Sequence, residues 1–156
     1  MAASRGAERR VQDEAPYERD FYGWCLHQAA LVRAGRLEAV DRENLAEELE
    51  ALGREQEHAL ESSLRVLLIH LLKWRWQPQR RSRSWRATIV RERGEYESRL
   101  ARNPGLKPKR QALLAVAYRR ARREAAAETG VETGTFPEAC PFTLEQVVDD
   151  EFWPEA

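Results

Sequence analysis

The stretch LLKWRWQPQRRSRSWRATI, residues 71–89, predicts a turn between two helices at the centre of the fold. It holds three tryptophans and six cations but no acidic residue. Pro78 ends the first helix, because proline lacks an amide hydrogen and clashes with the preceding turn. Ser84 is a suitable N-cap, so we expect the second helix to begin there and to end near Asn103. The helices on both sides of this basic turn are anchored by Trp74, Trp76 and Trp85.

The helix that enters this turn is predicted to be long. Asp41 can cap its start, and apolar residues then recur every three or four positions through residues 42–76. An unbroken helix would span about 52 Å, whereas a compact chain of this size has a diameter of roughly 39 Å. We therefore expect a bend or break at Gly53, where glycine costs about 1 kcal/mol relative to alanine. Residues 66–72 are apolar on every side, which predicts the centre of the core.

Two further helices and an ordered tail are predicted around this pair. Residues 17–33 place apolar side chains three or four positions apart before a stop at Gly35. Another helix begins after Pro108 and ends at Gly130. The tail offers two capping boxes, Thr135 with Glu138 and Thr143 with Gln146. Its apolar side chains are too many to leave in water, which predicts an ordered strap with a short helix that buries Phe136, Phe142, Val147, Phe152 and Trp153.

The composition agrees with an all-helical protein. The sequence has 156 residues with only 8 Gly and 7 Pro, and its 26 basic and 26 acidic residues cancel. Residues 1–14 are small and polar, so we expect a disordered N-terminal tail. Residues 15–156 are predicted to form one domain. The fold class is an all-α, up-and-down bundle of four or five main helices with an ordered C-terminal strap and a short terminal helix.

The sequence favours a cytoplasmic protein. Cys25 and Cys140 lie far apart and fit neither a disulfide framework nor a zinc cluster. The N-terminus has no apolar signal region, and the longest apolar run is too short to span a membrane.

Four separated motifs resemble those of the bacterial domain of unknown function family 29. They are DFYGWC at residues 20–25, ENLAEELEALGR at 43–54, HLLKWRWQPQRRSRSW at 70–85 and TFPEACPFTLEQVVDDEFWP at 135–154. The resemblance extends over most of the chain, from Tyr17 to Trp153. It implies an all-helical bundle in a bacterial, cytoplasmic protein. It transfers no activity, because the resemblance supplies no catalytic residue.

The basic turn has two interpretations. Residues 73–93 hold eight cations and one acid, and Arg80, Arg81, Arg83 and Arg86 could bind the phosphates of a nucleic acid while tryptophans stack on bases. Alternatively, the charge is neutralised within the chain, because residues 38–61 carry nine acids and two bases and residues 131–156 carry seven acids. Burial of a tryptophan gains more than stacking on a base, which favours the structural interpretation. We expect structural roles for Trp74, Trp76, Trp85, His70, Ser84 and Trp153.

A metal site is a second alternative. Glu55 and His58 form one E-x-x-H motif, which supplies two ligands from one helix face in di-iron bundles. The second motif that such sites need is absent. His70, within a long apolar run, is predicted to be a buried histidine that bonds to a backbone or carboxylate partner.

No motif indicates catalysis. The serines and cysteines lack a nucleophile elbow or an adjacent base, and no glycine-rich phosphate loop is present. We expect no catalytic residue and no cofactor. The sequence favours an interaction or adaptor module with an unidentified protein partner and no membrane contact, leaving its oligomeric state open. Nucleic-acid binding and metal binding are the alternatives.

Overall fold

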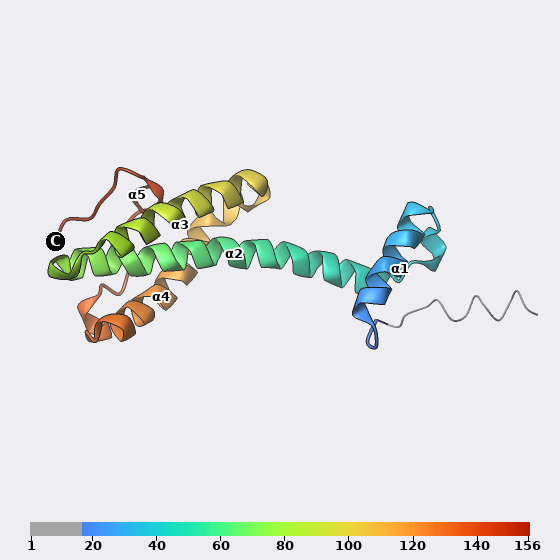
Figure 1. Cartoon of the computed structure of the whole chain (residues 1–156), viewed down its shortest axis with the longest axis horizontal. Coiled ribbons are helices and arrows are strands. Elements are labelled where there is room, and N and C mark those ends of the chain that lie inside the picture. The colour runs from blue at the N-terminus through green and yellow to red at the C-terminus, as the bar shows by residue number, and fades with distance from the viewer. Residues whose placement is uncertain (1–16) are drawn as a thin grey trace, which may run out of the picture. The chain divides into compact units, whose positions relative to one another are not determined.

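We describe residues 17–156 in a computed structural model of the chain (Figure 1). The predicted N-terminal tail, residues 1–14, lies outside the described residues. The described part has five α-helices and no strand, which confirms the all-α bundle class. The helices are α1 (Phe21–Arg33), α2 (Arg42–Trp76), α3 (Arg83–Arg102), α4 (Arg110–Thr129) and α5 (Leu144–Val148).

The described chain divides into two compact units, with the boundary after Gly53. Residues 17–53 form the N-terminal unit and Arg54–Ala156 the C-terminal unit. The predicted break at Gly53 is wrong, because α2 continues through this glycine to Trp76. A single glycine costs only about 1 kcal/mol, which helical turns on both sides can offset. The single domain over residues 15–156 stays a prediction, and each unit is described by itself.

In the N-terminal unit, the start of α2 is held to α1 by polar contacts around Asp41. Its carboxylate accepts hydrogen bonds from the indole of Trp24 at 3.2 Å and from the backbone amide of Asn44 at 3.4 Å. The Asp41 backbone amide donates to the side chain of Gln28 at 2.8 Å. Trp24 and Gln28 are both buried. These bonds confirm Asp41 as the cap of α2 and fix which side of α1 faces inward.

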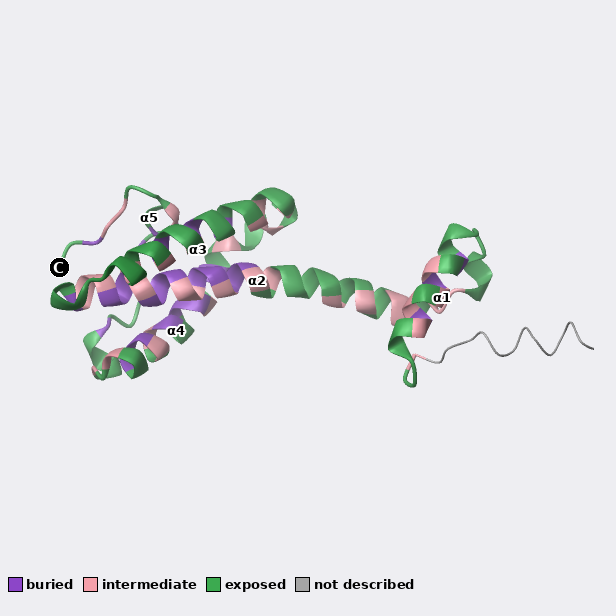
Figure 2. Ribbon diagram, in the orientation of Figure 1, coloured by how far each residue is buried: buried purple, intermediate pink, exposed green. Residues whose placement is uncertain are grey.

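The core of the C-terminal unit surrounds the second half of α2. Within residues 66–72, all but Val66 and His70 are buried, which confirms the predicted centre (Figure 2). α4 contributes a narrow buried face, confirmed at Leu113, Leu114, Ala117, Ala121 and Ala125. α3 adds Ile89 and Tyr96 to the same core. None of the described helices is both long and apolar enough to cross a bilayer.

The first turn of α3 corrects the predicted cap. Ser82, not Ser84, is the N-cap, with an extended backbone and a side chain that accepts from the Trp85 amide at 3.2 Å. Ser84 lies inside the first turn, and its hydroxyl is 2.9 Å from that of Ser82. The helix begins earlier than predicted because Ser82 occupies the extended conformation that a cap requires.

The C-terminal strap is ordered, as predicted. α5 begins with the predicted capping box, in which Thr143 and Gln146 bond reciprocally. The predicted box at Thr135 is wrong, because this residue ends a short 3₁₀ turn, η4 (Thr133–Thr135), without a side-chain cap. The apolar side chains of the strap join the core or pack against it: Phe136, Phe142, Val147, Phe152 and Trp153.

Candidate functional site

The tryptophans of the basic turn pack within the C-terminal unit. The ring centroids of Trp74 and Trp153 are 4.9 Å apart, and Trp76 meets Phe136 edge-on at 5.6 Å. Trp74 and Trp76 therefore anchor different parts of the strap, as expected for side chains two positions apart on a helix. Trp85 is half-buried.

Cations of the turn lie over these indole rings. Lys73 lies 4.6 Å from the ring centroid of Trp85, and Arg81 lies 5.0 Å from that of Trp74. In addition, Arg75 lies over Trp76, and both Arg86 and Arg93 lie over Trp153. A ring already covered by a cation on one face offers less surface for stacking on a base. The geometry therefore supports a structural role for the tryptophans.

The acidic segments neutralise the basic turn only in part: Arg93 faces the charges of Asp149 and Asp150 in the tail, but four arginines of the turn have no such partner in the described chain. Among the described residues, no carboxylate forms an ion pair with Arg80, Arg81, Arg83 or Arg86. Arg81 instead donates to the backbone carbonyl oxygens of Trp74 at 2.9 Å and Pro154 at 3.4 Å. Lys73 pairs with Glu128 at 2.7 Å, outside the two acidic segments. Carbonyl dipoles and indole faces can therefore stabilise cations where carboxylates were expected.

Arg80 and Arg83 differ from the cations of the turn that contact indole rings or carbonyl oxygens. Both side chains are exposed, and neither makes a hydrogen bond, ion pair or ring contact within residues 17–156. They lie beside the N-terminus of α3, which favours anions. The geometry thus leaves two of the four predicted nucleic-acid contacts free.

The predicted metal ligands lie on α2 in the C-terminal unit. Glu55 and His58 are both exposed. In the described part of the chain, no three His, Cys, Asp or Glu side chains gather closely enough to hold a metal ion. The metal site stays a prediction that metal analysis can test.

His70 has the backbone partner predicted for it. Its Nδ1 lies 2.9 Å from the carbonyl oxygen of Val66, so the Nδ1–H tautomer donates to that oxygen. The side chain is half-buried, and this burial lowers the pKa of His70 below its usual value. The contact supports the structural role, since the ring N–H finds its partner within its own helix.

Exposed apolar side chains are concentrated in the N-terminal unit, a feature that the sequence patterns did not predict. The described residues include eight large apolar side chains that are exposed, and only Val90 lies in the C-terminal unit. Leu49 and Leu52 belong to the apolar repeat predicted along residues 42–76 but are 60% and 55% exposed. The other five are Phe21, Tyr22, Leu26, Val32 and Leu37.

α1 is apolar on opposite sides. Trp24 is buried, and Tyr22 and Leu26 lie two positions before and after it, so both point about 160° away from it. Tyr22 is 75% exposed and Leu26 is 54% exposed. We define the outer face of α1 as the exposed residues Tyr22 and Leu26. Phe21 and Val32 are also exposed but lie at the edge of the inward side, about 60° and 80° from Trp24, and Phe21 stacks on Trp24.

The sequence did contain a signal for this face. Residues 21–32 include no Asp, Glu, Lys or Arg, although the whole chain has 52 such residues. A helix that is apolar all round is normally buried in its functional state. The uncharged run could therefore have identified α1 as a contact helix.

The N-terminal unit carries an excess of acidic residues. Its described residues include eight acids and four bases. Tyr17 donates a hydrogen bond to Glu48, which raises the pKa of that tyrosine. A hydrogen bond from Asn44 lowers the pKa of Asp41, so this carboxylate stays charged at neutral pH. The net charge of this unit therefore favours a positively charged partner.

Comparison with known proteins gives one match. The family model described as Domain of unknown function DUF29 matches residues 16–153. No curated protein and no solved structure matched the chain.

Proposed function

Because the chain belongs to the family described as Domain of unknown function DUF29, whose description names no activity, we propose a function from its surface. The protein is a cytoplasmic interaction module. Through the outer face of α1, it binds an amphipathic helix of a partner protein, whose apolar side docks on α1 and whose flanks are basic.

One observation carries this proposal: an uncharged helix leaves one of its two apolar sides in water. The inward side of α1 is occupied by Trp24, Gln28 and Leu31, whereas Tyr22 and Leu26 on the opposite side are more than half exposed. Contiguous exposed apolar surface typically marks a contact with another molecule. Burial of such surface stabilises a complex by roughly 25 cal/mol per Å² before the entropic costs of association.

An amphipathic helix is the partner that suits this shape. A helix lays an apolar stripe against its neighbour, with side chains three or four positions apart. Tyr22 and Leu26 are themselves one turn apart, so a second helix can pack along them.

The charge of the N-terminal unit selects a basic partner. Eight acids against four bases favour Lys and Arg on the flanks of the docking helix, which steer association and exclude acidic competitors. The same negative charge disfavours the anionic surface of a bilayer, which attracts basic segments. A basic protein helix is therefore the occupant to which the proposal commits.

Nucleic-acid binding through the basic turn is supported more weakly. Its supporting observation is that Arg80 and Arg83 are exposed and without partners in the described chain. Arg81 and Arg86 already contact indole rings. Two free arginines supply far fewer phosphate contacts than the roughly 6–10 that a typical DNA-binding protein makes.

The proposal is tested by fluorescence anisotropy with a labelled helical peptide of alternating Leu-Leu and Lys-Lys pairs. The full chain is compared with the variants Leu26→Glu and Val90→Glu. Leu26 and Val90 are similarly exposed, at 54% and 52%, so both variants carry the same charge on an exposed apolar position. We expect Leu26→Glu to weaken binding about tenfold, since it places a charge within the apolar contact. Val90→Glu should leave binding unchanged.

Two outcomes would contradict the proposal. Equal binding of the peptide by the two variants would show that the outer face of α1 is not the contact. Equal binding of a matched peptide with Glu in place of Lys would exclude the basic partner. We also expect sedimentation to find a monomer. Self-association that Leu26→Glu abolishes would contradict the proposal, since a second copy of the chain would then be the occupant of this face.

A further inference from the structure

The C-terminal unit contains an open cleft that none of the features above explains. It has a volume of about 610 Å³, within the range of roughly 300–1,000 Å³ that is usual for ligand sites. One wall is the exposed side of α3. The other walls are the 3₁₀ segment η3 (Pro104–Lys109) and the strap at residues 148–150.

The floor of the cleft is apolar and firmly held. Tyr96 is buried in the core, and Leu100 and Val148 are partly buried and pack against it. Arg93 fixes the strap beside α3, because its guanidinium donates to the carbonyl oxygens of Val147 and Asp150 at 3.1 and 3.3 Å. The cleft is therefore a preformed feature of the bundle.

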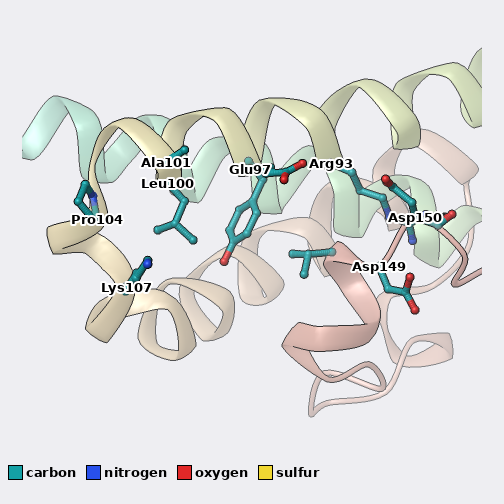
Figure 3. A pocket seen from close by; sticks show the side chains of 10 residues that line it. Arg93, Glu97, Leu100, Ala101, Pro104, Lys107, Asp149 and Asp150 are labelled. Carbon is teal, nitrogen blue, oxygen red and sulfur yellow. Dashed lines mark hydrogen bonds between the residues drawn. The ribbon is translucent and has the colours of Figure 1, made fainter.

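Opposite charges lie at the two ends of the cleft. Figure 3 shows Lys107 at one end, Asp149 and Asp150 at the other, and Leu100 between them. Within the described chain, the ammonium of Lys107 and the carboxylate of Asp150 make no ion pair or hydrogen bond. The carboxylate of Asp149 accepts only from the backbone amide of Glu151, at 3.0 Å. Lys107 is thus available to an external anion, and Asp149 and Asp150, although they also face the charge of Arg93, are open to an external cation.

Tyr96 adds a polar group beside the apolar floor. Its hydroxyl is buried and makes no hydrogen bond of good geometry within the described chain, although the guanidinium of Arg110 lies close enough to interact with it. Burial raises the pKa of Tyr96, against the opposing charge of Arg110, so the hydroxyl stays a neutral donor.

We propose that this cleft binds the C-terminal end of a short peptide. The free carboxylate of the peptide pairs with Lys107, apolar side chains cover Leu100 and Val148, and a basic group reaches Asp149 and Asp150. A fatty anion would meet the acids at the far end, and a polyamine would meet Lys107, so neither satisfies both ends. The site is independent of the outer face of α1, which belongs to the N-terminal unit.

The test uses the tetrapeptide Arg-Val-Ala-Leu with free ends as the probe, titrated into the isotope-labelled full chain and followed by NMR. We expect shifts at the backbone amides of residues 96–101 and 148–150. Lys107→Gln should weaken binding about three- to fivefold, as expected for loss of one exposed ion pair. The same variant, Lys107→Gln, should bind the peptide with an amidated C-terminus as tightly as the wild type does. Asp150→Asn should weaken binding of both peptides.

A matched control lies two residues beyond Lys107. Lys109 is exposed, does not line the cleft and pairs with Glu57 at 2.5 Å, so Lys109→Gln removes the same charge outside the site. The proposal is overturned if millimolar probe causes no shifts in residues 96–101. It is equally overturned if Lys107→Gln and Lys109→Gln weaken binding by the same factor, or if the amidated peptide binds as tightly as the free acid.

Discussion

The Nη2 atom of Arg93 donates a 2.7 Å hydrogen bond to the carbonyl oxygen of Phe152. Arg93 is only 2% exposed, and its other donors reach the carbonyl oxygens of Val147 and Asp150. Burial lowers the pKa of Arg93, and the charges of Asp150 and Asp149 oppose this shift. One arginine of α3 thus donates to three carbonyl oxygens of the strap and links the strap to α3.

Replacement of Arg93 should destabilise the protein strongly. Arg93→Met keeps much of the volume but leaves three carbonyl oxygens without their donor, so we expect a loss of about 3 kcal/mol in the free energy of unfolding. Arg91→Met is the control on the same helix. Arg91 is exposed and pairs only with Glu92, so its loss should cost less than about 1 kcal/mol. Urea denaturation of both variants checks the difference, and equal costs would contradict the proposed role of Arg93.

The cap of α3 can be tested with two serines. Ser82→Ala removes the acceptor of the Trp85 amide and should cost about 1 kcal/mol. Ser84→Ala removes only a contact between hydroxyls at the helix surface, and should cost less than about 0.5 kcal/mol. Thermal or urea unfolding of the two variants distinguishes them. A larger cost for Ser84→Ala would reinstate the cap predicted from the sequence.

His70 should make stability depend on pH. Because burial lowers its pKa in the folded chain, the unfolded chain binds the proton more readily. The contribution to stability is therefore present above the unfolded pKa of about 6.5 and is lost as the pH falls through the lower folded pKa. In His70→Gln this part of the pH dependence should disappear. Urea unfolding of the wild type and of His70→Gln from about pH 7 to about pH 5 checks this prediction. Urea midpoints that fall in parallel for the two proteins would contradict it.

The basic turn should bind nucleic acid weakly. Its tryptophans pack within the bundle and only Arg80 and Arg83 lack partners, so anisotropy with mixed-sequence single-stranded DNA should show little binding at physiological salt. Arg80→Ala with Arg83→Ala should then change little. Tight binding that falls steeply with salt and is lost in this double variant would favour the nucleic-acid alternative.

Sequence periodicity predicted the core of the C-terminal unit well, because burial there follows local rules. Residues 66–72 lack charge on every side of the helix, and the small face of α4 allows close packing, so both patterns report burial directly. The boundaries were also close: α2 spans the predicted residues, and Gly130 ends α4 in the left-handed conformation that glycine favours.

What the sequence did not predict depends on partners in three dimensions. Charge counts suggested carboxylates for the arginines of the turn, but Arg81 and Arg86 meet carbonyls and indole rings that periodicity does not identify. The apolar repeat along α2 does not show that Leu49 and Leu52 stay more than half exposed. The cleft brings together α3, η3 and the strap, and two of its lining residues, Arg93 and Asp150, are 57 positions apart in the sequence.

Site-specific photo-crosslinking tests the central proposal most directly. A photoreactive benzoylphenylalanine replaces Leu26 on the outer face of α1, or Val90 as the matched exposed control on α3. We predict that illumination with the basic Leu/Lys helical peptide yields a crosslink from position 26 and none from position 90. Equal crosslinking at the two positions, or crosslinking at position 90 alone, would contradict the assignment of this face as the binding surface.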